Sequence, residues 1–412
     1  MREVAVSRAF ALSRVWLGAL CALAFIAAVA AGSARSAWAA PGSSLMSRTV
    51  SGFRPLSVTF VSPGTGWVLG RAPCAGGPSC LALRETTDGG RSWIARPLPA
   101  SLIAAAGRSL AGVVDPIAQL NVRFGDPRDG WIYGGIVVKL AQGDSVEPAL
   151  WSTHDGGLRW RREHLAGIAG SVYDVEAADG TVHLLAQNTR FGATVESSPL
   201  TEDNWRVSTS VSLNDPAGGA EPSGAVVLHA SSGWLVEGND RGTSGSARLG
   251  RNGRWLSWRP PCAAVGGSFA VPAASTASDL VAVCVIGGFA SPLTKSAPRG
   301  ATLGSSWLYL SKDGGKTFRA GPELERRPDF AIGVLASPRP GVILLGTSGP
   351  HAAELRASFD AGLRFTVVYQ GQVTFLGFTT PTQGVAIVQP PGESTSMIMT
   401  LDGGHHWRRV GF

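Results

Sequence analysis

Five copies of one short pattern constrain the fold of this 412-residue chain more than any other feature. Each copy has Ser or Thr, then Asp, then Gly at alternate positions, and Trp or Phe three residues after the Gly. The copies are Thr86-Asp88-Gly90-Trp93, Thr153-Asp155-Gly157-Trp160, Ser311-Asp313-Gly315-Phe318, Ser358-Asp360-Gly362-Phe365 and Thr400-Asp402-Gly404-Trp407. Repeats with such spacing indicate an architecture in which one supersecondary unit is copied several times.

Each copy has the chemistry of a tight turn between two apolar segments. Gly adopts positive φ without a Cβ clash, and the Asp carboxylate and the Ser/Thr hydroxyl can bond backbone N–H groups of their own turn. Around the third copy, Leu308, Leu310 and Phe318 alternate as they do in a β-hairpin. The closing aromatic side chain can pack over the turn and fix it. The repeat therefore predicts a β-hairpin unit.

The pattern resembles the Asp-box, or bacterial neuraminidase repeat (BNR), of sialidases, sortilin-type receptors, xyloglucanase-type glycosidases and photosystem II assembly factors of the Ycf48/Hcf136 type. The resemblance is greatest to the assembly-factor group, whose blades read as an apolar strand, a Gly-Trp step, another strand and then the box. Residues 58–93 and 122–160 follow that order, with Gly66-Trp67 and Gly130-Trp131 at the step. The resemblance implies an all-β β-propeller with each box between the third and fourth strands of a blade. Such a resemblance predicts the fold better than it predicts the function.

The spacing of the boxes predicts seven blades. Two units without a complete box fit between Asp155 and Asp313: one runs from Val172 to Trp205 and the other from Val226 to Trp255. We expect seven four-stranded antiparallel blades that start near residues 53, 119, 170, 224, 267, 329 and 372. Six or eight blades are the alternatives. The ring is expected to close by side-chain packing between the first and last blades, with residues 48–53 as a possible added strand.

The N-terminal segment has the pattern of a secretory signal. Arginines precede an apolar run from Val15 to Ala31, and Ala37-Trp38-Ala39 is a small-x-small cleavage site. We expect residues 1–39 to be a signal peptide, with a retained membrane anchor as the alternative. Residues 40–52 are then an N-terminal extension, and residues 53–412 a single propeller domain. No other segment is apolar over a length that spans a bilayer, so the protein is predicted to be secreted, extracellular or in the cell envelope.

Four cysteines remain after this predicted cleavage, and an even number in an exported protein suggests disulfides. Cys74 and Cys80 bracket a short Gly/Pro segment and form the local pair. Cys262 and Cys284 would then connect neighbouring blades. Metal binding is the alternative, but the sequence has no CxxC spacing and no His near these cysteines. We therefore expect no metal and no cofactor.

Charge argues against nucleic acid as a partner. The formal net charge is +7, part of which lies in the signal segment, and charged residues make up 16% of the chain. Both signs are interspersed, so the chain lacks the basic stripe that nucleic-acid binding needs. We expect a protein or glycan ligand and a monomeric protein.

The topology of a propeller predicts which face carries the binding site. In antiparallel blades the box turns share one face with the turns between first and second strands. The other face carries the loops between second and third strands and the connections between blades. The long insertions fall in these two classes: residues 71–79, 99–119, 141–147, 238–247 and 287–305. Elaborated loops on a rigid scaffold often carry binding sites, although neutral loop growth would give the same pattern. The candidate binding residues on this face are Asp144, Arg190, Asp240, Arg241, Arg299 and Tyr369, the last of which is expected in the connection from blade six to blade seven.

No catalytic residue can be assigned. The resemblance to sialidases would require three arginines that clamp a carboxylate, a Tyr nucleophile with a Glu partner, and an Asp acid/base. Nothing around Arg190, Arg241 or Arg299 matches that family, and no Glu lies near Tyr369 in the sequence. A two-carboxylate glycosidase would need a pair such as Asp144 and Asp240 across a cleft. The sequence favours a non-catalytic binding protein, with a secreted glycoside hydrolase, exo-sialidase-like or glucanase-like, as the alternative.

Overall fold

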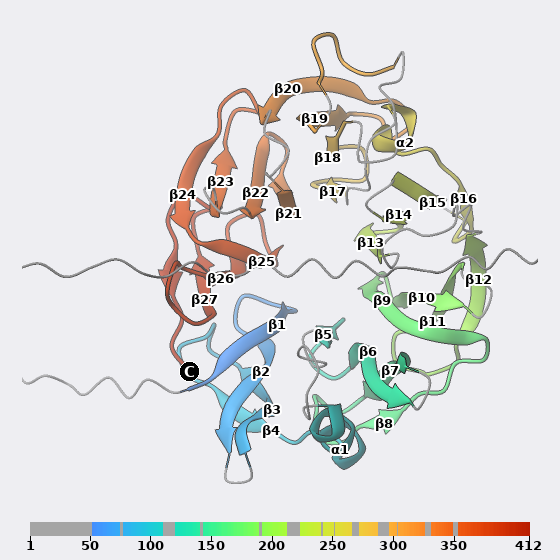
Figure 1. The fold of residues 1–412 in the computed structure, drawn as a ribbon, viewed down its shortest axis with the longest axis vertical. Helices are drawn as coiled ribbons and strands as arrows, with labels where there is room; N and C mark the ends of the chain where they lie inside the picture. Colours follow the sequence, from blue (N-terminus) through green and yellow to red (C-terminus); the bar gives the residue numbers. More distant parts are fainter. Residues whose placement is uncertain are drawn as a thin grey trace, which may run out of the picture. The chain divides into compact units, whose positions relative to one another are not determined.

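The computed structural model describes residues 52–412 apart from 75–76, 110–119, 141–142, 189–191, 212–222, 240–241, 251, 266–271, 287–295, 303, 326–330 and 349–352. These residues belong to one compact unit, Val50–Phe412. Within them the chain forms seven antiparallel sheets of four strands each, and the sheets follow one another around a ring (Figure 1). The fold is a seven-bladed β-propeller, as the repeats predicted.

In blades one, two and four the fourth, outer strand is the shortest, with two or three residues. The strands of the first four blades are β1 Arg54–Phe60, β2 Gly66–Cys74, β3 Gly77–Thr86 and β4 Ile94–Arg96; β5 Asn121–Phe124, β6 Gly130–Leu140, β7 Gly143–Thr153 and β8 Arg161–Arg162; β9 Ile168–Ala178, β10 Thr181–Asn188, β11 Ala193–Pro199 and β12 Arg206–Val211; β13 Ser223–His229, β14 Ser232–Asn239, β15 Gly242–Leu249 and β16 Trp255–Ser257.

The last three blades have the same order. Their strands are β17 Ala273–Ala274, β18 Leu280–Val285, β19 Ser306–Ser311 and β20 Arg319–Glu325; β21 Ala331–Arg339, β22 Val342–Ser348, β23 Glu354–Ser358 and β24 Thr366–Gln370; β25 Gln372–Phe378, β26 Gly384–Gln389, β27 Ser396–Thr400 and β28 Arg408–Arg409. The first strands begin close to the predicted positions, and blades three and four form without a complete repeat turn. In blade five the first strand is only two residues long.

Among the described residues, the first and last blades share no strand where the ring closes. β1 to β4 make one sheet and β25 to β28 another. The two sheets are joined by side chains: the rings of Phe53 and Phe412 lie 4.6 Å apart, beside a buried cluster that includes Val58 and Met397. Gln383 also donates from Nε2 to the backbone oxygen of Pro63 at 2.9 Å. Closure by side-chain packing therefore agrees with the expectation. Residues 48–51, which were considered for an added strand, lie outside the described part of the chain.

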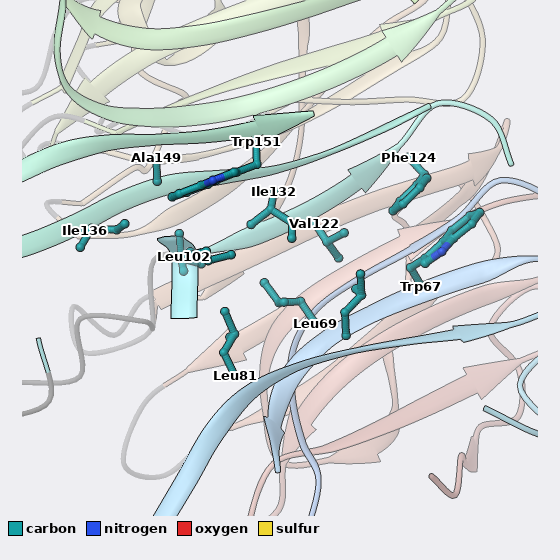
Figure 2. Packing of buried hydrophobic residues seen from close by; sticks show 12 residues of the cluster. Trp67, Leu69, Leu81, Leu102, Val122, Phe124, Ile132, Ile136, Ala149 and Trp151 are labelled. Atoms are coloured by element: carbon teal, nitrogen blue, oxygen red, sulfur yellow. The ribbon is translucent and has the colours of Figure 1, made fainter. Parts of the chain in front are cut away.

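The hydrophobic core is divided among the interfaces between consecutive blades, which we call seams. Figure 2 shows the seam between blades one and two, where the rings of Trp67 and Phe124 stack with centroids 3.7 Å apart. Leu102 lies fully buried in the same cluster as Trp151 and Leu81. Burial of large side chains at every seam gives the ring its main stabilisation.

The connection between blades one and two contains a helix that the sequence analysis did not anticipate. α1 spans Ala100–Ser109 in a segment that was expected to be a plain loop. It is rich in Ala, the residue with the highest helix propensity, and the backbone oxygen of Pro99 accepts hydrogen bonds from the N–H groups of Leu102 and Ile103. Its buried Leu102 packs in the seam, so the helix contributes to the core between blades one and two. A second helix, α2 (Pro261–Val265), follows blade four. Among the residues that the structure describes, neither helix has the length and apolar character to cross a bilayer.

Candidate functional site

The five repeat turns share one hydrogen-bond arrangement. In each, the Ser or Thr hydroxyl donates to Oδ1 of the repeat Asp at 2.8–3.0 Å. The same hydroxyl accepts from the backbone N–H of the repeat Gly at 2.8–3.0 Å. Oδ1 of the Asp then accepts from a backbone N–H four residues later at 2.9–3.0 Å. The hydroxyl and the carboxylate are therefore used to satisfy their own turn.

Each repeat turn is also bonded to the turn between the first and second strands of its own blade. The backbone N–H that follows the repeat Asp donates to a carbonyl of that neighbouring turn at 2.8–2.9 Å in all five blades. In blade one, for example, Gly89 donates to Gly64. Both kinds of turn therefore lie together, and we call this side of the ring the turn face. We call the side with the second-to-third strand hairpins and the blade connections the hairpin face.

The carboxylates of the turn face are held ionised by their own turns. Hydrogen bonds from the Ser92 side chain and backbone lower the pKa of Asp88 to about 2. Bonds from the Thr317 side chain and backbone lower the pKa of Asp313 to about 2 in the same way. Because these oxygens already accept several internal donors, they are poorly suited to recognise a ligand. The turn face therefore carries repeated structural elements.

The repeat glycines and aromatic residues connect each turn to the preceding blade. Gly404 has a φ of +97°, and a Cβ at this position would lie 2.7 Å from Cδ2 of Leu344 in blade six. Trp407 closes the same turn by donating from Nε1 to the backbone oxygen of Gly404 at 3.1 Å. Glycine is therefore required both for the backbone conformation and for the close approach. These contacts give the predicted repeat residues a structural role.

The hairpin face differs from blade to blade. Its blade-one hairpin, between β2 and β3, carries the predicted disulfide Cys74–Cys80. The β6–β7 hairpin of blade two has two strands of eleven residues, whose paired positions extend to Leu140 and Gly143. α1 covers the first seam, and α2 is joined to β18 by the second predicted disulfide, Cys262–Cys284. The segments that differ from blade to blade therefore lie on the face opposite the repeat turns.

The structure does not bring the six predicted binding residues together into one described site. Arg190, Asp240 and Arg241 lie outside the described residues. Asp144 is on β7, where its backbone pairs with Lys139 near the end of the long hairpin. Arg299 is exposed in a turn that precedes β19.

Tyr369 requires a correction. It was placed in the connection from blade six to blade seven, but it lies on β24, where it pairs with Leu355. Its hydroxyl accepts from Nε of Arg409 in blade seven at 3.4 Å, and Arg409 also bonds Glu393 at 2.6 Å. Tyr369 therefore contributes to the seam between blades six and seven.

A cavity of about 240 Å³ lies between blades five and six, and none of the six predicted residues lines it. Its walls include Leu324, Leu345, Arg356 and Phe365. Arg356 donates from Nε to Oε1 of Glu354 at 2.5 Å, so part of its guanidinium is already engaged. The volume is below the roughly 300–1,000 Å³ of pockets for drug-sized ligands. The cavity therefore does not by itself define a ligand.

Charged groups near the ring axis at the seam between blades two and three were also missed. Arg123 on β5 forms an ion pair with Glu176 on β9, and Tyr133 donates to Oδ1 of Asp174 at 3.1 Å. Burial raises the pKa of Glu176 to about 7, although Arg123 opposes the shift. The alternation of polar and apolar residues in β5 is the signal that could have indicated this cluster, since Arg123 falls between the buried Val122 and Phe124.

One further carboxyl is buried in blade four. Glu237 on β14 has no exposed surface, and neither of its carboxyl oxygens has a hydrogen-bond partner among the described residues. Burial raises the pKa of Glu237 to about 8. This shift favours the neutral carboxyl at pH 7.

No protein-family model and no curated protein sequence matches the chain. Among solved structures, it is similar to YCF48 bound to a D1 peptide, with a TM-score of 0.52 and 16% identity over 85% of this chain and 94% of that chain. It is also similar to the BP39L lectin from Burkholderia pseudomallei, with a TM-score of 0.53 and 12% identity over 88% of this chain and 100% of the lectin. An ulvan lyase of polysaccharide lyase family PL25 matches with a TM-score of 0.52 and 12% identity over 87% of this chain and 96% of that chain. At these identities the likeness establishes the β-propeller fold alone.

Proposed function

We propose that this chain is a secreted, non-catalytic β-propeller of the Asp-box type that binds a protein or a glycan on its hairpin face. The observation that carries the proposal is the difference between the two faces. On the turn face, repeat carboxylates are satisfied within their own turns. On the hairpin face, two disulfides, a long hairpin and two helices differ from blade to blade. Diversified segments on a rigid scaffold are where recognition usually resides.

The similar structures support a binding role in a limited way. YCF48 is described as bound to a D1 peptide, and BP39L is described as a lectin. A similar propeller therefore binds a peptide in YCF48, and BP39L is named for a class of sugar-binding proteins. Two disulfides support export, since disulfides persist in oxidising compartments. The N-terminal sequence supports the same compartment through its signal-like pattern.

A glycoside hydrolase remains the alternative, and Glu176 is the observation that favours it. Its pKa of about 7 suits a general acid, and its side chain keeps 19% of its surface exposed near the ring axis. The ulvan lyase shows that a similar propeller carries carbohydrate chemistry. The hydrolase predicts turnover of chromogenic sialosides or glucans that is lost in Glu176→Gln. The binding protein predicts no turnover of either class.

The face that binds can be identified with defined probes. Purified residues 40–412 are applied to a glycan array and a peptide array, and the strongest ligand is measured by calorimetry. In one variant, residues 139–144 are replaced by Asn-Gly, which shortens the β6–β7 hairpin beyond the Val138–Ser145 pair. The control variant is Leu363→Lys, at an exposed position of the turn face. A similar variant shortens the hairpin that Cys74–Cys80 closes. We expect at least one hairpin variant to lose affinity about tenfold or more, whereas Leu363→Lys retains it. Loss only in the turn-face variant would refute the proposal.

A further inference from the structure

A histidine between two carboxylates connects blades two and three. His154 belongs to the repeat turn of blade two, and its Nδ1 lies 2.5 Å from Oδ1 of Asp129 in the same blade. Its Nε2 lies 3.0 Å from Oδ2 of Asp203, which belongs to the turn between β11 and β12 of blade three. With both carboxylates ionised, both contacts are hydrogen bonds only when both ring nitrogens carry a proton. The geometry is therefore that of an imidazolium.

Asp203 receives three groups from blade two. Besides His154, its Oδ2 accepts from Oγ of Ser152 at 2.9 Å and from Nη2 of Arg161 at 2.9 Å. Its Oδ1 is buried and has no hydrogen-bond partner among the described residues. Ser152 also lies 3.0 Å from Oε1 of Glu163, but its single hydroxyl proton can serve only one of these two carboxylates. Asp203 therefore depends on the proton of His154 for one of its three hydrogen bonds from blade two.

Loss of that proton leaves a lone pair facing a carboxylate oxygen. A neutral imidazole has one N–H, so one of its contacts with Asp129 and Asp203 becomes repulsive. Burial alone lowers the pKa of His154, but the hydrogen bonds that it donates to Asp129 and Asp203 outweigh burial and raise it above its ordinary value. Burial raises the pKa of Asp129, with the nearby Asp126 adding to the effect and His154 opposing it. Asp129 and His154 therefore both keep a proton to a higher pH in the folded protein than they would with ordinary pKa values.

The charged groups around His154 come from every element that packs against it. Asp126 lies behind Asp129 in the turn between β5 and β6 and accepts its backbone N–H at 2.8 Å. Asp155, the next residue in the repeat turn, is paired with Arg159 at 2.8 Å. On β8, Nε of Arg161 lies 2.8 Å from Oε1 of Glu163. Acidic groups outnumber the arginines, so a proton on His154 is favoured electrostatically.

Among the described residues, this seam also lacks an indole hydrogen bond that two other seams have. Trp67 donates from Nε1 to the backbone oxygen of Gly156 in the repeat turn of the next blade, and Trp234 donates to Gly314 in the same way. Trp131 occupies the equivalent place in blade two, but blade three has no complete repeat turn, and the indole N–H of Trp131 has no partner among the described residues. The ionic cluster around Asp203 therefore replaces the missing turn as the polar connection on this side of the ring.

We propose that the seam between blades two and three is a pH-sensitive latch. The proton on His154 holds it closed at about pH 6, and loss of that proton toward about pH 8 loosens this seam and leaves the others closed. This inference does not depend on the ligand or on the hairpin face.

The direction follows from proton linkage. A group whose pKa is higher in the folded state stabilises that state below its unfolded pKa, and the contribution is lost as the pH rises through the folded pKa. Because the pKa of His154 is raised, its contribution to the stability of the folded state is lost as the pH rises above 6.5, the ordinary value. The contribution of Glu176, at the same seam, is likewise lost as the pH rises from 4.5 to about 7. Both groups therefore favour the closed seam in mild acid.

The first test needs no variant. Histidine-labelled protein is titrated by NMR, with the His154 signal assigned from His154→Gln. We expect His154 to titrate above 6.5, the value for an unperturbed histidine. His406 provides an internal comparison, since its side chain is 91% exposed and bonds Asp402 of its own turn. A pKa for His154 at or below 6.5 would overturn the proposal.

The second test measures opening of the seam. Hydrogen exchange with mass spectrometry is followed at pH 6 and pH 8 for peptides that cover residues 150–163 and 199–206, after correction for the intrinsic exchange rate. We expect protection to fall about tenfold or more at pH 8, the size expected for hydrogen bonds to a charged group. In Asp203→Asn the fall should vanish, because an amide can donate to a neutral imidazole. The control His406→Gln should behave like the unaltered protein.

Two results of the exchange experiment would contradict the latch. One is equal protection at pH 6 and pH 8 in the unaltered protein. The other is an equal fall at every seam, which would mean that the whole ring is destabilised. If Asp203→Asn does not fold, the NMR titration and the unaltered protein still decide the question.

Discussion

The tryptophans of the Gly-Trp step allow a matched test of how the repeat turns connect the blades. Trp234 and Trp131 both follow a glycine at the start of a second strand, and both are fully buried. Nε1 of Trp234 donates to the backbone oxygen of Gly314 in the next repeat turn at 3.1 Å. Nε1 of Trp131 has no acceptor among the described residues. Trp→Phe at each position removes the same atoms, but only Trp234→Phe removes a hydrogen bond.

The difference between the two variants can be worked out from these contacts. The packing loss is similar in both, because the same ring is shortened at a buried site. Trp234→Phe also leaves the carbonyl of Gly314 buried without its donor, which costs about 1–3 kcal/mol. Trp131→Phe removes an unpaired N–H and carries no such cost. For a unit of this size the unfolding entropy is about 0.7 kcal/mol per degree, so the excess for Trp234→Phe corresponds to about 1–4 °C in Tm.

Scanning calorimetry measures this difference, with far-UV circular dichroism to verify that each variant keeps its strands. The unaltered protein, Trp131→Phe and Trp234→Phe are compared at one pH and one concentration. We expect Trp234→Phe to melt below Trp131→Phe. Equal melting temperatures, or a lower value for Trp131→Phe, would refute the idea that the repeat turn acts as an acceptor across the seam.

Three other predictions follow from single residues. Gly404→Ala should destabilise the ring by more than about 1 kcal/mol, because φ is +97° and the added Cβ would meet Leu344. Gly253 also has positive φ but no neighbour within 4 Å, so Gly253→Ala should cost only about 1 kcal/mol. Chemical denaturation measures both losses. Asp313 has a folded pKa of about 2 against an ordinary value of 3.8, so its contribution to stability is present above pH 3.8 and is lost toward pH 2. Between pH 5 and pH 2 the melting temperature of Asp313→Asn should therefore fall less steeply than that of the unaltered protein. An unchanged slope would contradict this. Glu237 has a folded pKa of about 8 against an ordinary value of 4.5, so it lowers the stability of the folded protein as the pH rises from 4.5 to 8. In thermal melts at pH 8, Glu237→Gln should be at least as stable as the unaltered protein. A large loss of stability there would show that the carboxyl has a partner.

The repeat turns were predictable because their chemistry is local. Ser358, Asp360 and Gly362 bond one another within five residues of chain, so the sequence alone indicates the turn. Blade number followed from the spacing of such turns; blade three could be placed by its apolar strands, and blade four by its apolar strands and its Gly233-Trp234 step. The two disulfides were predictable from loop lengths and blade order. In each case the information lies in residues that are close in sequence.

The contacts between blades could not be predicted in the same way. His154 and Asp203 are 49 positions apart, and their approach depends on how blade three replaces its missing turn. The signal was nonetheless present, since residues 200–204 lack the turn glycine and contain two acids. α1 was missed because a long connection was treated as a loop, although its run of alanines favours a helix. Tyr369 was misplaced by a few residues, because strand ends are the least certain boundaries in a sequence.

The most direct test of the proposed division between the two faces is hydroxyl-radical footprinting of the protein with the ligand selected on the arrays. The account predicts that bound ligand protects side chains of the hairpin face, such as those of the β6–β7 hairpin and α1. It predicts that exposed side chains of the turn face, such as Leu158 and Leu363, remain as reactive as in the free protein. Protection confined to the turn face would contradict the account.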